Sequence, residues 1–223
     1  MLAGIVLAAG AGRRYGRPKA LVRLGGTLLV ERAAATLAAA GCRPVVVVVG
    51  AGAGQVRAAA DLADATLVDN PDWASGMASS LRSGLATVAA GPTTPAAPAA
   101  AAEVQPAGPP DAVVVLLVDM PGIGPAAVRR VAGGAHRRTL AVGGFGSGRT
   151  GHPVVLGRDH WAAVAATATG DAGARDYLRA HADQVRIVPC GDVADPTDLD
   201  RPADAIGCWP PQAQAGDLPA VTR

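Results

Sequence analysis

The sequence predicts a three-layer α/β/α fold built on a mostly parallel sheet. Two observations support this prediction. Short runs of valine, isoleucine and leucine, such as residues 4–9 and 44–49, are apolar throughout, as strands covered by helices on both faces are. Helix-like stretches separate these runs, and an alternation of strand and helix is typical of a parallel sheet with helices on either side.

The expected elements follow in chain order. Helices are predicted where apolar residues recur at helical spacing between turn-forming residues, and serines at the start of the third one make good N-caps. The predicted strands are 4–9, 44–49, 65–68, 111–118, 140–142, 153–156 and 184–188. The predicted helices are 27–40, 55–62, 79–90, 125–135 and 172–181.

The length of 223 residues suits one domain, which we expect over residues 1–205. Residues 91–110 are rich in alanine, proline and glycine and have no apolar periodicity, so they are predicted to form a flexible insertion. A long alanine-rich helix is the alternative, but Pro92, Pro95, Pro98 and Pro106 would interrupt it. Residues 206–223 are expected to form a loosely ordered tail.

The composition excludes several classes of protein. The formal net charge is only +2 and 17% of residues are charged, which gives no basis for nucleic-acid binding. No apolar run approaches the roughly 18 residues that a membrane span needs. Three cysteines without CxxC spacing, and a first strand with no basic region before it, favour a reduced cytoplasmic protein without structural zinc.

Residues 7–19, LAAGAGRRYGRPK, combine three glycines with four cationic side chains directly after a predicted strand. Glycines allow backbone N–H groups to converge on an anion, and the cations add charge that suits a triphosphate and its departing pyrophosphate. The loop is therefore predicted to bind phosphate. A solvated cationic turn is the alternative.

Two familiar phosphate-binding loops do not fit this segment. A P-loop needs Gly-Lys followed by Ser or Thr, whereas Gly16 is followed by Arg17. A dinucleotide fingerprint needs GxGxxG, whereas the glycines here follow GxGxxxG and the second predicted strand ends without an acidic residue. A nicotinamide-dependent oxidoreductase remains an alternative that rests only on the α/β pattern and this misspaced loop.

The same segment resembles a known signature, LAAGxxxRxGxxK, of the nucleotidyltransferases that activate the molybdenum cofactor, the MobA/MocA-like group. Five further blocks look like blocks of this family, in its order, over nearly the whole chain. The signature matches at Leu7, Ala8, Ala9, Gly10, Arg14, Gly16 and Lys19, and the blocks are NPDWASGMASSL (70–81), LLVDMP (116–121), GRTGHPVVL (148–156), GDAGAR (170–175) and DLDRPAD (198–204). The resemblance implies a Rossmann-like nucleotidyltransferase fold.

Asp119 follows six apolar residues, where a central strand should reach the ligand-binding edge of the sheet. From position alone it is equally a strand-end cap. The resemblance implies that it binds Mg²⁺, and magnesium in nucleotide sites takes one or two carboxylates besides phosphate oxygens. By alignment Asp200 is the second ligand, with Asp198 left open, because Arg201 replaces the threonine usual in the family.

The resemblance also implies roles for the remaining blocks. Arg14 and Lys19 would act with Asp119 in catalysis, and the signature residues Leu7, Ala8, Ala9 and Gly10 would hold the nucleotide. Gly76 and Ser80 would contact the nucleobase, in a pocket shaped by Asn70, while Trp73 either stacks on a ligand or anchors its loop. The acceptor would lie near His152, Asp171 and Arg175.

These assignments predict transfer of a nucleoside monophosphate from a nucleoside triphosphate to the phosphate of a molybdopterin-type acceptor, with release of pyrophosphate. The acceptor phosphate is already anionic, so no protein nucleophile is required. In the family LAAG accompanies cytidylyl transfer, so Ala9 favours CTP over GTP. Two alternatives remain: another phosphorylated acceptor such as a sugar phosphate, or a non-catalytic carrier that delivers the cofactor to a molybdenum enzyme.

Overall fold

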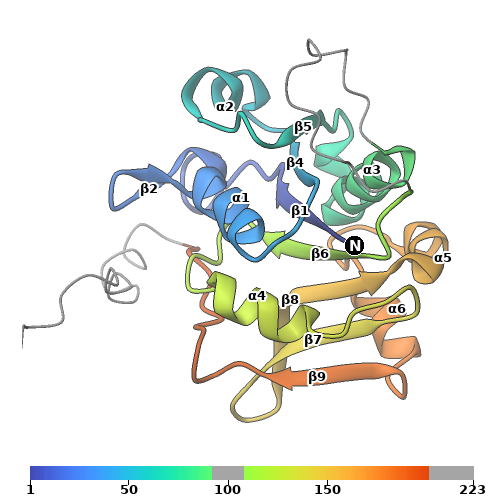
Figure 1. Ribbon diagram of the computed structural model, residues 1–223. Coiled ribbons are helices and arrows are strands. Elements are labelled where there is room, and N and C mark those ends of the chain that lie inside the picture. The colour runs from blue at the N-terminus through green and yellow to red at the C-terminus, as the bar shows by residue number, and fades with distance from the viewer. Residues whose placement is uncertain (92–107, 201–223) are drawn as a thin grey trace, which may run out of the picture.

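The computed structural model describes residues 1–91 and 108–200, which form a seven-stranded sheet flanked by helices (Figure 1). The strand order is β5-β4-β1-β6-β8-β7-β9. Neighbouring strands are parallel except at β8, which runs antiparallel to both β6 and β7. The strands are β1 (Leu2–Ala8), β4 (Val45–Val49), β5 (Thr66–Asp69), β6 (Ala112–Leu117), β7 (Leu140–Phe145), β8 (Arg149–Gly157) and β9 (Val185–Pro189).

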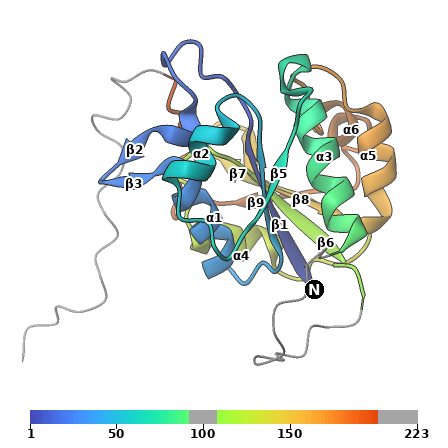
Figure 2. The same ribbon diagram turned by 90° about the horizontal axis from the view of Figure 1, so that it is seen from above.

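Helices cover both faces of this sheet (Figure 2). One face carries α1 (Leu29–Ala39), α2 (Ala53–Ala59) and α4 (Pro125–Ala132). The other carries α3 (Met77–Ala90), α5 (Trp161–Thr167) and α6 (Arg175–Ala180). The predicted three-layer α/β/α fold with a mostly parallel sheet is confirmed.

Two apolar cores lie on either side of the sheet, and the strand alternation divides the residues between them. Along β1, Val6 and Ala8 pack on the side of α1, whereas Ile5 and Leu7 pack on the side of α3. All five valines of β4 are buried, as a strand covered on both faces requires. Each buried valine contributes about 1.5–3 kcal/mol of transfer free energy, so the central strands are the stable base on which the loops are held.

Several predicted boundaries are wrong. Helix α3 begins at Met77 with Gly76 as its N-cap, so Ser79 lies within the first turn and its hydroxyl donates back to the Gly76 carbonyl (2.8 Å) instead of capping the helix. The residues expected to begin the first helix, 27–28, instead form strand β3 (Thr27–Leu28), paired with β2 (Arg23–Leu24). Helix α6 is shorter than expected because Gly170 and Gly173 adopt positive φ and hold the preceding residues in turns.

Two features of the C-terminal half were not predicted. The seven-residue helix α5 is too short for a clear periodic pattern. Strand β8 begins at Arg149, four residues before the predicted start at residue 153, so His152 belongs to the strand. Most of the predicted insertion (92–107) and the whole predicted tail (206–223) lie outside the described residues. Among residues 1–91 and 108–200, no helix is long and apolar enough to cross a bilayer.

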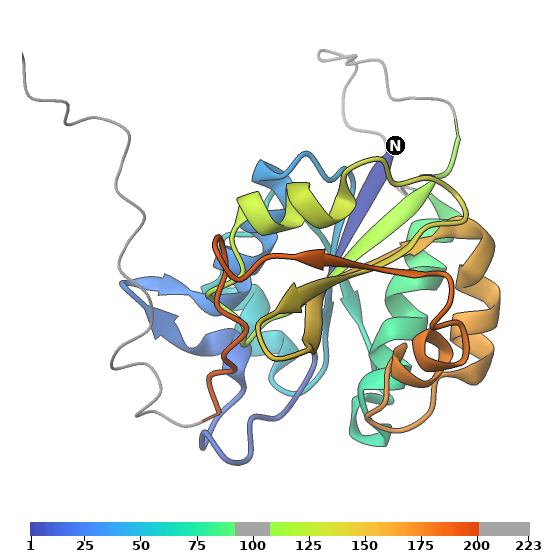
Figure 3. The ribbon, with the colours of Figure 1, turned by 90° about the horizontal axis from the view of Figure 1, so that it is seen from below.

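The chain after β9 returns to the edge where β1, β4 and β6 end (Figure 3, red). The N–H of Asp195 donates to the Gly122 carbonyl (3.2 Å), and the N–H of Leu199 donates to the Asp119 carbonyl (2.9 Å). These bonds fix the segment that carries Asp198 and Asp200 beside the end of β6, nearly eighty residues earlier in the chain.

Candidate active site

The glycine-rich loop folds back on itself directly after β1. The carbonyl of Gly12 accepts hydrogen bonds from the N–H groups of Tyr15 and Gly16 (3.0 and 2.9 Å). Gly12 has φ +59°, and a Cβ at this position would overlap the Arg17 carbonyl, so only glycine allows the turn. The loop therefore presents its backbone and arginines at the carboxyl end of β1.

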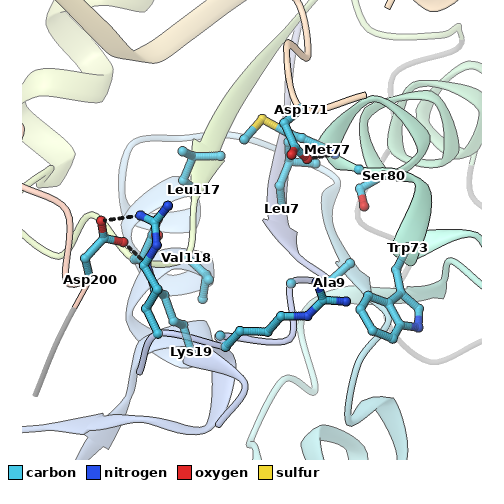
Figure 4. Close-up of a pocket in the computed structure, with 16 residues that line it drawn as sticks. Leu7, Ala9, Lys19, Trp73, Met77, Ser80, Leu117, Val118, Asp171 and Asp200 are labelled. Carbon is cyan, nitrogen blue, oxygen red and sulfur yellow. Dashed lines mark hydrogen bonds and ion pairs between the residues drawn. The ribbon is translucent and has the colours of Figure 1, made fainter. Parts of the chain in front are cut away.

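A cavity of about 350 Å³, here called cavity 1, lies at this edge of the sheet. It is bounded by the glycine-rich loop, the ends of β1 and β6, the start of α3 and the returning C-terminal segment. Figure 4 shows Lys19 and Asp200 on one side of it and Trp73, Met77, Ser80 and Asp171 on the other. The site residues named from the sequence that line it are Leu7, Ala9, Gly10, Arg14, Lys19, Gly76, Ser80, Asp119, Asp171 and Asp200.

Lys19 connects the two predicted metal ligands. Its Nζ donates to Asp119 Oδ2 (2.6 Å) and to Asp200 Oδ1 (2.7 Å), and Arg14 donates to the other oxygen of Asp200 (3.3 Å). Desolvation lowers the pKa of Lys19, but the hydrogen bonds and negative charges of the two carboxylates outweigh it and raise this pKa overall. The hydrogen bond and charge of Lys19, with a smaller effect of Arg14, lower the pKa of Asp200. Both shifts favour the charged forms of Lys19 and Asp200.

Asp198 is the third carboxylate of this region. Desolvation, followed by the negative charges of Asp119 and Asp200, raises its pKa. Asp200 lines cavity 1, whereas Asp198 lines a neighbouring cavity. Within residues 1–91 and 108–200, no three His, Cys, Asp or Glu side chains group as a metal site by themselves.

Two predicted binding residues do not reach cavity 1. Ala8 packs in the core beneath α1, because successive residues at the end of β1 point to opposite faces and only Leu7 and Ala9 face the cavity. Asn70 is 2% exposed, and its amide donates to Ser79 Oγ (2.8 Å) and Ser80 Oγ (3.0 Å). Asn70 therefore lies behind the wall and orients the serine that lines the cavity.

Asp171 was expected on the acceptor side but lines cavity 1. Its Oδ1 accepts the N–H of Met77 (3.2 Å), and the Gly170 carbonyl accepts the N–H of Ala78 (2.9 Å). These two acceptors satisfy N–H groups that are free at the start of α3. The position of Asp171 has a local cause, because the open N-terminus of the helix attracts the carboxylate.

A second cavity of about 620 Å³, here called cavity 2, shares Leu7, Met77 and Leu117 with cavity 1. Its other walls are mainly apolar and come from β6, β7, β8 and α6. Arg149 and Arg175 line it, and within the described residues neither forms a salt bridge. Cavity 2 therefore combines a wide apolar interior with cations available to an anion.

His152 also lines cavity 2 and is anchored in the sheet. Its Nδ1 lies 2.9 Å from the carbonyl oxygen of Val115 on β6. Burial lowers the pKa of His152, against the opposing effects of the Val115 carbonyl and of the Asp119 charge. The imidazole is thus a neutral group held in one orientation beside cavity 2.

Residues 4–185 match the family described as MobA-like NTP transferase domain. The chain belongs to this family. The resemblance drawn from the glycine-rich loop and the later blocks is therefore confirmed at the level of the family, and the chain is a nucleotidyltransferase of the MobA-like type.

Individual relatives of this MobA-like chain have different descriptions. A protein of Paenarthrobacter nicotinovorans called nicotine blue oxidoreductase is 38% identical over 204 residues, which cover 88% of this chain and 91% of that protein. A crystal structure of an Rv0371c homologue from Mycobacterium sp. strain JC1 is 29% identical, with a TM-score of 0.69 and 92% of each chain covered. A manganese complex of Rv0371c from Mycobacterium tuberculosis H37Rv is 26% identical, with a TM-score of 0.66 and 92% and 95% coverage.

Sequence reasoning assigned no role to Arg149 or Met77, which the MobA-like fold brings to the cavities. Arg149 belongs to a quoted block, and its charge beside His152 was a usable signal. Met77 lines both cavities, for which the sequence carries no signal. Trp73, left open from the sequence, lines cavity 1 and also packs closely over Gly50, where an added Cβ would lie 2.5 Å from the Trp73 Cβ.

Proposed function

We propose that this protein transfers CMP from CTP to the phosphate of a molybdopterin-type acceptor, with Mg²⁺ as cofactor and release of pyrophosphate. The observation that carries the proposal is the adjacency of two unlike cavities. Cavity 1 has a glycine-rich loop, cations and paired carboxylates, and cavity 2 has a wide apolar interior with arginines. An in-line transfer needs the phosphate of the acceptor and the α-phosphorus of the triphosphate to be held next to each other.

Cavity 1 suits the triphosphate. Lys19 and Arg14 would donate to phosphate oxygens and stabilise charge on the departing pyrophosphate. Both cations are now held by carboxylates, Lys19 by Asp119 and Asp200, and Arg14 by Asp200. A bound nucleotide would therefore draw them from these partners onto its phosphates.

The residues present fit a magnesium ion. Asp119 and Asp200 already face a common cation, the Lys19 ammonium, with N–O distances of 2.6 and 2.7 Å. Magnesium is commonly held by one or two carboxylates, with phosphate oxygens and water completing its coordination. When bound, Mg²⁺ would supply charge neutralisation at the triphosphate. A related structure contains manganese, another divalent ion that prefers oxygen ligands.

Cavity 2 suits the acceptor. Arg175 begins α6 and Arg149 lies on β8, so two cations approach the cavity from different elements. Arginine binds phosphate through a planar fork of donors. Leu7 and Leu117 line both cavities and mark the place where the cavities adjoin. There the acceptor phosphate would attack the α-phosphorus of CTP, and pyrophosphate would leave.

Ala9 is the basis for the choice of CTP. It is 4% exposed, lines cavity 1 and lies at the end of β1, where a methyl group shapes the wall against which a base would rest. One methyl group contributes about 1–3 kcal/mol of discrimination, so some transfer from GTP is also expected.

The test is pyrophosphate release from CTP and from GTP, with Mg²⁺ and with molybdopterin or its molybdenum-loaded form. We expect release that requires the acceptor, is faster with CTP and yields a cytosine dinucleotide product. Pyrophosphate release only with sugar phosphates would show that the acceptor is a sugar phosphate and not molybdopterin. Nucleotide binding without release, in the presence of a genuine acceptor, would support a non-catalytic carrier.

A second candidate function is reduction of a coloured heterocycle by a nicotinamide cofactor. The 38% identical relative is called nicotine blue oxidoreductase, and the apolar interior of cavity 2 would accept a flat ligand. Against it, the glycine-rich loop has GxGxxxG spacing and β4 ends at Val49 and Gly50 without an acidic residue for a ribose. Oxidation of NADPH with nicotine blue as electron acceptor would support this function, and its absence with active CMP transfer would reject it.

A further inference from the structure

The imidazole of His152 has a defined hydrogen-bonding state. Its Nδ1 lies 2.9 Å from the Val115 carbonyl oxygen, and a carbonyl oxygen only accepts hydrogen bonds. Nδ1 must therefore carry the ring proton. In a neutral imidazole the other nitrogen, Nε2, is then a bare acceptor with no proton to donate.

Nε2 has no partner within the described residues. The one hydrogen bond that the His152 side chain forms there uses Nδ1. The His152 residue is partly exposed, and it lines cavity 2.

The strand pairing explains why the imidazole is rigid. Strands β6 and β8 pair from Ala112 with Gly157 to Val115 with Val154, and the described pairing ends there. His152 lies two residues beyond Val154, and its side chain bonds the carbonyl of the last paired residue of β6. The ring is thus fixed where the two strands stop pairing.

Around this acceptor the walls of cavity 2 are apolar. Val142 and Val154 from the sheet, Phe145 at the end of β7 and Leu178 of α6 line the cavity with His152. An acceptor held in one orientation discriminates between ligands with and without a matching donor, because a ligand without one leaves it unpaired. The polar and charged groups that also line the cavity are Arg149, Thr150, Arg175, Arg179 and Asp198.

We propose that His152 is a specificity-determining residue of cavity 2 and that its Nε2 accepts a hydrogen bond from an N–H or amino group on a flat heterocyclic ligand. The inference rests on the proposed function in taking the acceptor substrate as the occupant of cavity 2. Arg149 and Arg175 then bind the anionic end of the ligand, while His152 selects the ring.

Two substitutions distinguish the contributions of Nδ1 and Nε2 of His152 to ligand binding. In His152→Asn the side-chain amide lies near the position of Nδ1 and still donates to Val115, but nothing replaces Nε2. In His152→Gln the side-chain carbonyl reaches toward the position of Nε2. His160→Asn is the matched control, since His160 bonds Tyr177 (2.8 Å) and lines neither cavity.

The probe is pterin-6-carboxylate, a flat anionic heterocycle with amino and ring N–H donors, whose fluorescence reports binding without turnover. We expect His152→Asn to raise its dissociation constant about tenfold, the effect of one hydrogen bond, while His152→Gln and His160→Asn stay close to the parent. Glucose 1-phosphate should compete weakly, with no change in His152→Asn. Pterin binding unaltered by His152→Asn, or lost equally in both His152 variants at unchanged Tm, would overturn the assignment.

Nitrogen NMR of the unsubstituted protein gives an answer that needs no variant. With ¹⁵N-labelled histidine, we expect the Nδ1-protonated tautomer of His152, and an Nε2 resonance that moves upfield when pterin-6-carboxylate is added. A protonated Nε2, or an Nε2 resonance that does not move at saturation, would contradict the inference. Because neither measurement involves CTP, failure of CMP transfer and failure of this assignment are separate results.

Discussion

Cavities 1 and 2 meet at a shared wall but are built in opposite ways. Cavity 1 takes its polar groups from loops and helix starts, and its charges are paired in a compact cluster around Lys19. Cavity 2 takes most of its lining from strands and α6, and Arg149 and Arg175 are without salt bridges within the described residues. Under the proposed function, cavity 1 would bind the reacting polyphosphate and cavity 2 would bind a ring-bearing anion.

The largest expected effect concerns the charge cluster of cavity 1. Asp119→Asn should lower the rate of CMP transfer on the order of a thousandfold, because it removes a charge that orients Lys19 and would hold Mg²⁺. Steady-state pyrophosphate release measures this. Asp69→Asn, which removes the exposed partner of Arg57 and lines neither cavity, is the control and should retain the parent rate. Equal rates for the parent and Asp119→Asn would show that CMP transfer does not take place in cavity 1.

On the side of cavity 2, Arg175→Gln should raise the KM for the acceptor by about tenfold to a hundredfold, the effect of one charged hydrogen bond. The KM for CTP should not change, since Arg175 does not line cavity 1. Initial-rate measurements with each substrate varied in turn distinguish the two constants. Arg57→Gln is the matched control. A parallel rise in both KM values would contradict the division between the cavities.

A third substitution tests the wall of cavity 1 at Gly76. Gly76 has φ +110°, and a Cβ there would lie 2.5 Å from the backbone of Gly170, so Gly76→Ala should destabilise the protein by about 1–3 kcal/mol and weaken CTP binding. Thermal unfolding and CTP titration measure the two effects. Gly54→Ala in α2 has an unobstructed Cβ position and no positive φ, so it should be neutral or slightly stabilising. A Gly76→Ala protein with parent Tm would show that this contact is not needed.

The smallest expected effect is on base choice. Ala9→Gly should reduce the preference for CTP over GTP by about five- to tenfold, since one methyl group contributes modestly to discrimination. The ratio of kcat/KM values for the two nucleotides is the measurement, with Ala11→Gly in the same loop as control. An unchanged ratio in Ala9→Gly would mean that this methyl group does not select the base.

How well each cavity was predicted follows from how its residues are distributed in the chain. The glycine-rich loop is contiguous, so the edge of the sheet where cavity 1 lies could be predicted from residues 7–19 alone. The same segment did not reveal that the side chain of Ala8 faces the core, because a signature does not say which residues of a strand face the cavity. Cavity 2 draws on β6, β7, β8 and α6, so its polar groups could only be recognised block by block.

The fold shows the same division. Buried strands such as β4 are apolar along their whole length and were predicted within one residue of their ends. Hydrogen bonds that join distant segments leave no local pattern. The contact of Asp171 with the start of α3 joins residues 94 positions apart, and sequence periodicity did not reveal it. The antiparallel course of β8 has a local cause, because residues 146–148 are too short a connection from β7 for a parallel crossover, and this signal was not used.

The most direct test of two cavities with separate substrates is a crystal structure of the protein with CTP and Mg²⁺ and without an acceptor. We expect the triphosphate against Gly10 and Lys19, the metal at Asp119 and Asp200, the cytosine beside Ala9 and Ser80, and no nucleotide in cavity 2. Cytosine bound in cavity 2 beside His152, or a triphosphate that does not contact the glycine-rich loop, would contradict the account.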